Sequence, residues 1–211
     1  TQPKELSPDS FIGRDEELTH LKRTLERVVA EHGQMDMIVG EPGIGKSRLS
    51  EELSTFGRES GVRVLYGRCY EEGGAPPYWP WAQAVRAYLS ETQTQELVSV
   101  LGPRASLVAV IFPAINELIP DLEPFDPGQQ DPEGVRFRLF DAAASFLIDI
   151  SNASPTLIVV DDLHWADESS LKLLVFLARE LERSHLYILG TYRDVDLDRK
   201  HPLSDALGDL A

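Results

Sequence analysis

The sequence predicts an α/β fold with a doubly wound parallel sheet, because short apolar runs alternate with amphipathic helical patterns along its 211 residues. The predicted strands are 35–39, 62–67, 156–162 and 186–191. The predicted helices are 14–32, 135–151, 168–183 and one that begins just after a glycine-rich turn at 40–45. With 42% hydrophobic residues, the chain can bury the core of one large domain or two small ones, and we expect one.

The first part of the pattern is a helix followed by a β-loop-α-β unit. Residues 14–32 carry leucine and valine at helical spacing, with three acidic residues in the first turn, where the helix dipole favours anions. The apolar run "MDMIV" is the first strand, and Leu49, Leu53 and Phe56 form one face of the helix that follows the glycines. The run "VRVLYG" completes the unit as the second strand.

The pattern is looser from 71 to 134, and we expect this segment to be a helical and loop insertion or cap. Helical spacing recurs at 80–90 and 94–118, whereas four prolines in 119–134 exclude regular structure there. The aromatic run "PPYWPW" at 76–81 is either local core or a partner surface.

The last part returns to strand and helix. The continuous apolar run in "TLIVVDD" predicts a buried strand, and "LYILGT" predicts another. Between them, Asp167 is the predicted N-cap of helix 168–183.

The net charge of the chain limits the kinds of partner that it can bind. Lys and Arg number 20 and Asp and Glu 35, which gives a net charge of -15. Phosphate backbones and anionic lipid surfaces repel such a domain, so we expect neither direct nucleic-acid binding nor membrane binding. The single cysteine, Cys69, excludes an internal disulfide and fits the reducing cytoplasm, and no apolar run approaches the roughly 20 residues that span a bilayer.

We expect residues 1–10 to be a polar leader and 11–211 to be one domain of a longer protein. The chain starts at Thr1 rather than Met and stops at "DALGDLA", inside an amphipathic segment. The downstream domains of the same chain are therefore its expected partners.

The glycine-rich turn carries the strongest functional signal. The string "GEPGIGKS" fits G-x-x-x-x-G-K-[ST], the loop that wraps a phosphate chain with backbone N–H groups. It lies between a strand and a helix, where the helix N-terminus adds positive potential, and this context argues against a mere turn with an exposed lysine. Lys46 is predicted to reach the β- and γ-phosphates, and the Ser47 hydroxyl to ligate Mg²⁺. The predicted nucleotide-binding residues of the loop are Gly40, Glu41, Pro42, Gly43, Ile44, Gly45, Lys46, Ser47 and Arg48.

A phosphate loop of this kind needs a carboxylate at a neighbouring strand end, and "LIVVDD" supplies two. We predict that Asp161 holds Mg²⁺ through water, and that Asp162 orients or deprotonates an attacking water. A merely polar strand terminus is the alternative, which the nearby phosphate loop disfavours.

Two arginines are further candidates. Arg193 follows the fourth strand in "GTYRD" and is predicted to contact the γ-phosphate, with Thr191 as a weaker polar contact; a surface ion pair with the aspartates beside Arg193 is the alternative. Arg14 opens a helix, where the dipole disfavours a cation, so it either positions the nucleotide base, with Ile12 nearby, or snorkels onto the surface.

The residues that follow Asp161 and Asp162, the acidic pair, carry a weaker functional signal. Trp165 is predicted to be a packing residue, and His164 either contacts a water on the phosphate side or caps the next helix. The five histidines and one cysteine show no ligand spacing, so we expect no zinc.

With these motifs in place, the chain resembles the nucleotide-binding domain of the STAND ATPases, signal-transduction ATPases related to AAA+ proteins. The resemblance is strongest to the group found in large LuxR-type bacterial transcriptional regulators and in multidomain nucleotide cyclases. Four segments carry it, "FIGRDEEL", "GEPGIGKSRL", "VVDDLHWADESSL" and "GTYRDVDLDRKHPL".

The resemblance implies a P-loop NTPase core with the sensor strand between the phosphate-loop and carboxylate strands, and ATP or ADP in preference to GTP. It also implies five strands, of which the last, with the C-terminal lid over the nucleotide, would lie beyond Ala211. In such proteins the positions of Arg14, Lys46, Ser47, Asp161, Asp162 and Arg193 would be the base-side arginine, the phosphate and Mg²⁺ ligands, the acidic pair and the γ-phosphate sensor.

The favoured function is an ATPase switch with slow hydrolysis in a cytoplasmic signal-transduction or transcriptional regulator, with a nucleotide-dependent homo-oligomer as a further expected state. Slow turnover is expected because Asp162 is shorter than the glutamate of many fast relatives. The alternatives are a regulatory module that binds ADP or ATP without hydrolysis, and a small-molecule kinase in which 71–134 is the acceptor lid.

Overall fold

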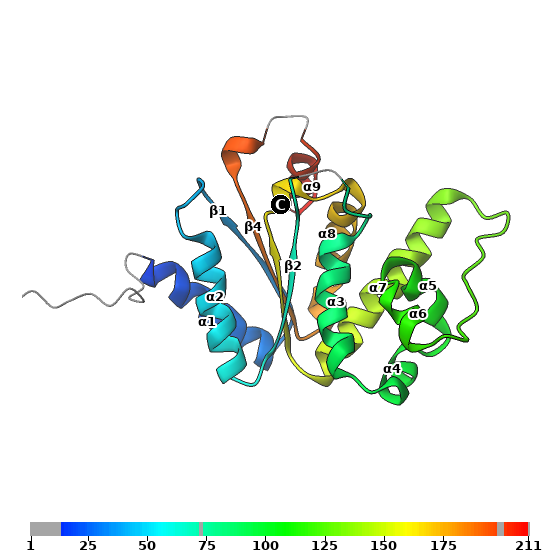
Figure 1. Ribbon diagram of the computed structural model, residues 1–211. Helices are drawn as coiled ribbons and strands as arrows, with labels where there is room; N and C mark the ends of the chain where they lie inside the picture. The colour runs from blue at the N-terminus through cyan, green and yellow to red at the C-terminus, as the bar shows by residue number, and fades with distance from the viewer. Residues whose placement is uncertain (1–13, 72–73, 198–200, 211) are drawn as a thin grey trace, which may run out of the picture.

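A computed structural model describes residues 14–71, 74–197 and 201–210 of the chain. Its centre is a four-stranded, fully parallel sheet in the order β1-β4-β3-β2. The strands are β1 (Gln34–Val39), β2 (Arg63–Arg68), β3 (Thr156–Asp161) and β4 (Leu186–Tyr192). The predicted α/β class is therefore confirmed, and β4 lies between the phosphate-loop strand and the carboxylate strand (Figure 1).

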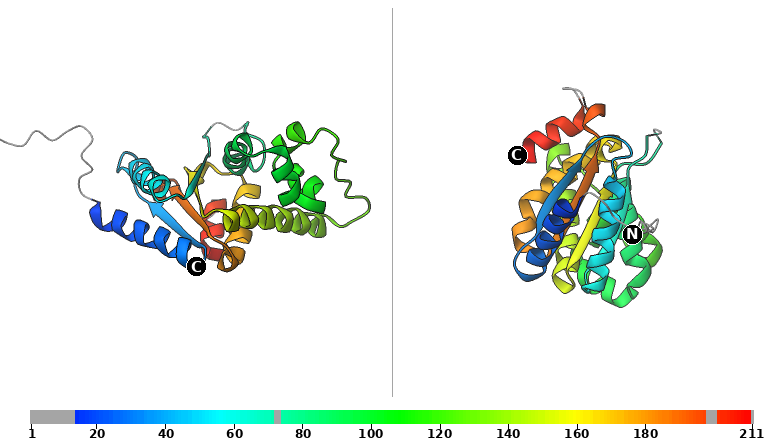
Figure 2. Two further views of the ribbon diagram at one scale, coloured as in Figure 1. Left: turned by 90° about the horizontal axis from the view of Figure 1, so that it is seen from below. Right: turned by 90° about the vertical axis from the view of Figure 1, so that its left-hand side faces the viewer.

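Helices cover both faces of the sheet. Their bounds are α1 (Asp15–Ala30), α2 (Lys46–Glu59), α3 (Trp79–Glu91), α4 (Thr94–Leu101), α5 (Ala105–Ile111), α6 (Ala114–Leu118), α7 (Pro132–Ala153), α8 (Glu168–Glu180) and α9 (Pro202–Leu210). On one face, α1 and α2 pack against alternate residues of β3 and β4 such as Leu157 and Leu189. On the other face, a larger core joins the sheet to α3, α7 and α8, as the two sides of the sheet in Figure 2 show.

Burial on both faces explains the uninterrupted apolar runs. All six residues of β3 are buried, and so are the first six of β4. A strand with helices on both sides has no solvent-facing side, so its sequence shows no polar alternation.

The segment 71–134 contains four helices with different roles. Helix α3 packs directly against β2, whereas α4 and α5 pack against α7, beyond the sheet (Figure 1). The ion pair between Arg104 and Asp149 of α7 adds a polar contact to this junction.

The helical pattern predicted at 94–118 corresponds to several short helices and not to one continuous helix. The segment is broken into α4, a 3₁₀ turn at Gly102–Arg104, α5 and α6. Gly102 has φ +53°, a left-handed conformation that ends a helix, and Pro113 cannot donate the backbone hydrogen bond that would continue α5.

Two other helix boundaries differ from the predictions by about one turn. Helix α7 begins at Pro132, because the Asp131 carboxylate accepts a hydrogen bond from Gly134 N at 2.7 Å and proline suits the first turn. Helix α8 ends at Glu180, and a 3₁₀ turn continues to Arg183. Within the described part of the chain, no helix combines the length and apolar character needed to cross a bilayer.

The packing of α3 on β2 depends on a glycine and yields a stability test. A Cβ on Gly67 would lie 2.0 Å from the carbonyl oxygen of Pro80, so Gly67→Ala must push α3 away from the sheet. Overpacking of this kind costs about 1–3 kcal/mol, and we expect a loss of that size in the free energy of unfolding measured by urea denaturation. Gly208→Ala is the matched control, because a Cβ on Gly208 would meet no atom within 4 Å and alanine favours α9 by about 1 kcal/mol. Equal stability of the two variants would contradict this account of the packing.

Candidate nucleotide-binding site

The carboxyl ends of the four parallel strands lie along one edge of the sheet. In the register, Ile38 of β1 pairs with Thr191 of β4, and Asp161 of β3 pairs with Arg68 of β2. β3 and β4 pair directly with each other up to the residue before Asp161 and Thr191. One row across the sheet therefore joins the end of the phosphate-loop strand to the acidic pair.

The phosphate loop connects β1 to α2 in an open conformation. Gly43 and Gly45 have φ values of +77° and +96°, which side-chain-bearing residues rarely adopt, and a Cβ at either position would meet no atom within 4 Å. Gly45 is the N-cap of α2, so the N–H groups of the first turn of α2 lie at the end of the loop. This is the backbone arrangement that binds an anion at a helix N-terminus.

The side chain of Lys46 folds back into this loop. Its Nζ donates hydrogen bonds to the carbonyl oxygens of Gly40 at 2.7 Å and Glu41 at 3.0 Å, and only 7% of the residue is exposed. Burial lowers the pKa of Lys46, and the nearby Arg193 guanidinium lowers it further, whereas the carboxylates of Asp162 and Asp161 oppose the shift. The acidic pair and the predicted sensor thus lie within electrostatic reach of Lys46.

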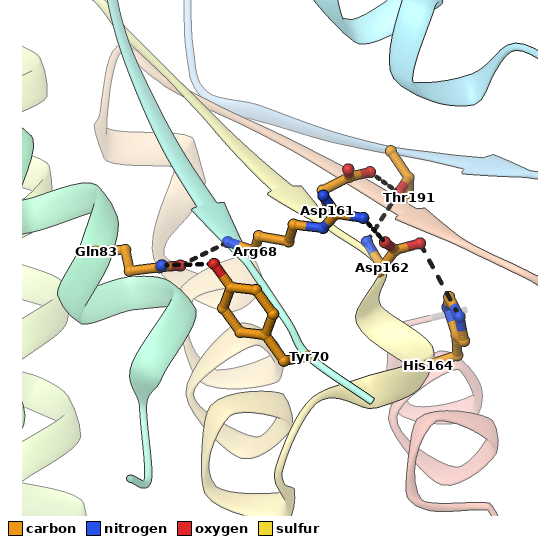
Figure 3. A network of polar contacts seen from close by, with 7 residues as sticks. All are labelled: Arg68, Tyr70, Gln83, Asp161, Asp162, His164 and Thr191. Atoms are coloured by element: carbon orange, nitrogen blue, oxygen red, sulfur yellow. Dashed lines mark hydrogen bonds and ion pairs between the residues drawn. The ribbon is translucent and has the colours of Figure 1, made fainter. Parts of the chain in front are cut away.

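The acidic pair is held by Thr191. The Thr191 hydroxyl donates to Asp161 Oδ1 at 2.5 Å and accepts a hydrogen bond from the Asp162 N–H at 3.0 Å (Figure 3). Asp162 has φ +59°, a left-handed conformation that turns the chain directly after β3. Sequence reasoning gave Thr191 a weak contact to the phosphate, but its hydroxyl lies against the two aspartates.

Arg68 is a site residue that the sequence analysis missed. It is the last residue of β2, and its Nη2 lies 3.1 Å from Asp162 Oδ2 (Figure 3). On the other side of the same carboxylate, Nε2 of the buried His164 lies 4.0 Å from Asp162 Oδ1. No local sequence pattern identifies Arg68 as a site residue. Its contact with Asp162 depends on the pairing of β2 with β3, and the residues around Arg68 do not encode that strand order.

Other predicted residues lie around this centre. Arg14 precedes α1, its carbonyl accepts a hydrogen bond from Leu18 N, and its charge adds a small lowering to the pKa of Lys46. Ser47 is exposed in the first turn of α2, and Arg48 pairs with Glu52 at 2.8 Å. Ile12 lies outside the described residues.

The predicted N-cap of α8 is confirmed. Asp167 accepts hydrogen bonds from Ser170 N at 3.0 Å and from the Ser170 hydroxyl. Trp165 packs against the larger core, as predicted, although it also lines a cleft beside the acidic pair.

The side chains fit a magnesium ion only together with a phosphate chain. In the described residues no group of three or more His, Cys, Asp or Glu side chains could hold a metal alone. Mg²⁺ is commonly bound through one or two protein oxygens, with phosphate oxygens and waters completing the shell. Ser47 and Asp161 match that donor set.

Comparison with known proteins agrees with this geometry. Residues 10–189 match the family described as the AAA ATPase domain. The chain belongs to this family. As an AAA ATPase domain, the chain is a P-loop ATPase of the AAA+ type, a class that binds ATP or ADP, generally with Mg²⁺.

Two similar proteins place the domain in context. The uncharacterized protein R02095 of Rhizobium meliloti (strain 1021) is 27% identical over 215 residues, which cover 95% of this chain and 20% of that protein. The chain thus spans about a fifth of that relative. The crystal structure of Cdc6p from Pyrobaculum aerophilum matches with a TM-score of 0.57 and 13% identity, over 99% of this chain and 46% of that one, which supports the fold.

The bridge made by Thr191 gives a second stability test. Thr191→Val keeps the shape of the buried side chain but leaves a carboxylate oxygen and a backbone N–H without their partner, at a cost of about 1–3 kcal/mol. We expect urea denaturation to show that loss. Thr191→Ser keeps the hydroxyl and should lose only about 1 kcal/mol for one buried methyl group. A serine variant as unstable as the valine variant would contradict the role of the hydroxyl.

Proposed function

We propose that the AAA ATPase domain is a switch that binds ATP with Mg²⁺ and hydrolyses it slowly. The observation that carries this proposal is the position of the Lys46 ammonium, which donates hydrogen bonds to two carbonyl oxygens of the glycine loop. The charges of Arg193, Asp162 and Asp161 lie close enough to act on its pKa. Two cations and two carboxylates at the end of a glycine loop suit a triphosphate and its metal ion.

The loop and Lys46 would bind the phosphates. The N–H groups of Gly43 and of residues 45–47 would offer donors, and the Lys46 ammonium would exchange its two carbonyl partners for phosphate oxygens. Ser47 and Asp161 would hold Mg²⁺, which when bound neutralises charge on the phosphate oxygens. Thr191 keeps the Asp161 carboxylate oriented for this role.

Asp162 would act on the attacking water. The residue is 9% exposed and its carboxylate is bound by Arg68, so it must leave that ion pair, or share it, to accept a proton. This constraint, together with the short aspartate side chain, supports slow turnover and a long-lived triphosphate state. Arg193 would contact the γ-phosphate and report its loss.

We further propose that the domain is of the STAND class and regulates other domains of its own chain in a signal-transduction or transcriptional regulator of the cytoplasm, without binding nucleic acid or membrane itself. The net charge of -15 supports the last point, and the motif strings support the class. A nucleotide-dependent homo-oligomer is part of the same proposal.

The ion pair of Asp162 also favours a second candidate, a regulatory module that holds ADP or ATP without hydrolysis. If Arg68 retains the Asp162 carboxylate after ATP binds, no base is available to the water. If the full-length protein hydrolyses ATP and Asp162→Asn lowers the rate of hydrolysis, this candidate is ruled out.

Two substitutions test the switch. Lys46→Ala removes the ammonium at the loop and should weaken ATP and ADP binding by more than about 100-fold, which corresponds to about 2.7 kcal/mol, in isothermal titration calorimetry with Mg²⁺. Lys172→Ala is the matched control, because Lys172 is exposed on α8 and forms an ion pair with Glu168 of the same helix, one turn away. Undiminished binding by the Lys46 variant would overturn the proposal.

A substitution at Asp162 distinguishes nucleotide binding from hydrolysis. Asp162→Asn keeps the size of the side chain and should leave Mg-ATP binding within about threefold, while phosphate release falls to background because an amide cannot accept the proton. Hydrolysis that survives both Lys46→Ala and Asp162→Asn is the result that excludes an ATPase built on these residues.

A further inference from the structure

The aromatic run at 76–81 connects the core to a series of rings on α7 and α8. Trp81 is 1% exposed, and its Nε1 donates to a backbone carbonyl of α8 at 3.1 Å, so this ring belongs to the core. Trp79, by contrast, is only partly buried. The ring of Tyr78 meets that of Phe140 on α7 edge-on, with 6.1 Å between the ring centroids.

The series of rings ends at an exposed phenylalanine. Phe140 is 5% exposed and meets Phe176 of α8 at 5.8 Å between centroids. Phe176 meets Phe137 of α7 at 5.7 Å, and Phe137 is 61% exposed. A large apolar ring that is left in water beside other apolar side chains indicates an interaction surface.

Phe137 lines a groove between α7, α8 and α9. Helix α8 contacts both of the other helices, and the groove along them has a volume of about 800 Å³. Its apolar lining consists of Phe137, Phe140, Leu171, Val175, Phe176 and Ala206. Among the described residues, the groove shares none with the phosphate loop, the acidic pair or the arginines of the nucleotide site. It is therefore a separate surface.

The groove has the shape that recognises a helix. On α8, the lining residues Leu171, Val175 and Arg179 follow one another at intervals of one turn, so the groove extends over two turns, or about 12 Å. Its walls are helices whose backbone groups are already hydrogen-bonded, so an extended segment would gain no strand pairing there. A helix instead places apolar side chains at i, i+3, i+4 and i+7 along such a groove.

The charged side chains leave the α9 wall of the groove acidic. Most of them have partners: Glu168 pairs with Lys172, Glu133 lies 4.0 Å from Arg136, and Asp131 caps α7. Asp205, Asp209 and Arg179 form no ion pair within the described part of the chain. Asp205 and Asp209 are one turn apart on α9, so both carboxylates lie on the same side of that helix.

This charge distribution favours a basic partner. Two unpaired carboxylates against one unpaired cation attract a segment with more basic than acidic side chains. The net charge of -15 on the chain adds attraction for such a segment, whereas it repels a second copy of the same chain. Exposed ion pairs contribute little affinity, so the apolar floor would supply most of it and the charges would select the partner.

We propose that the groove between α7, α8 and α9 binds a basic amphipathic helix of a partner protein. Its apolar side chains pack against Phe137 and Phe176, and two basic side chains one turn apart lie opposite Asp205 and Asp209. The proposal goes beyond the proposed function and does not depend on it, because the groove and the nucleotide site are separate.

A synthetic peptide tests the groove. The probe is a fluorescein-labelled peptide of 15 leucine, alanine and lysine residues, with leucine at every third or fourth position and lysines one turn apart beside this stripe. The control peptide has the same composition, but its leucines are spread around the helix. We expect fluorescence polarisation to show saturable binding of the first peptide, at least about tenfold tighter than of the second. No saturable binding, or equal binding of both peptides, would overturn the proposal.

A substitution at the exposed ring tests the location. Phe137→Ala removes the aromatic anchor and should weaken binding of the amphipathic peptide at least about tenfold. Val110→Ala is the matched control, because Val110 is 45% exposed on α5 and does not line the groove. Both variants lose mainly exposed atoms, and urea denaturation checks that both remain folded. Equal affinity of the two folded variants would place the peptide elsewhere and overturn the proposal.

The acidic wall is tested by charge. Asp205→Asn combined with Asp209→Asn should weaken peptide binding about threefold or more and reduce its dependence on salt. Glu26→Gln combined with Glu59→Gln removes the same net charge from exposed positions on α1 and α2, and should have less than half of that effect. Equal effects of the two double variants would show that only net charge matters and would overturn the placement of the basic side chains.

The remaining occupant, a second copy of the chain, is tested by sedimentation velocity with and without Mg-ATP. We expect Phe137→Ala to leave the sedimentation coefficient unchanged in both conditions. Self-association that Phe137→Ala abolishes would assign the groove to a second copy and overturn the partner helix.

Discussion

The site depends on the two hydrogen bonds that the hydroxyl of Thr191 makes with the acidic pair. Asp161 is 4% exposed, and a buried carboxylate is costly unless hydrogen bonds satisfy it. Thr191 supplies one such bond and uses the same oxygen to fix the N–H of Asp162. Because Thr191 and Asp161 stand on neighbouring strands, the orientation of the acidic pair is set by the parallel pairing of β3 with β4.

The acidic pair also joins the two sides of the sheet edge. Asp161 faces β4 through Thr191, whereas Asp162 faces β2 through Arg68. Arg68 is in turn fixed through its backbone N–H by Gln83 of α3. Short polar contacts through Arg68 therefore connect the acidic pair to α3.

The phosphate loop is stabilised by its own lysine. The Lys46 ammonium satisfies two loop carbonyls, and Gly43 and Gly45 hold the backbone in conformations that leave the space above it open. The lysine is thus kept buried at a position from which it could donate hydrogen bonds to a phosphate. Its burial lowers its pKa by desolvation, so a bound phosphate oxygen would restore the charge stabilisation that burial removes.

Local sequence patterns were enough to predict the fold class, the four strands, the phosphate loop and the acidic pair, because periodicity, glycine spacing and strand-end residues can be read along the chain. The tertiary structure alone decided that Arg68 meets Asp162, that Thr191 bridges both aspartates, and that Trp79 and Trp81 have different surroundings. Arg68 and Asp162 are 94 residues apart, and such contacts depend on strand order and register, which no local pattern encodes. The break of 94–118 into short helices came from Gly102 and Pro113, local signals that apolar periodicity obscured.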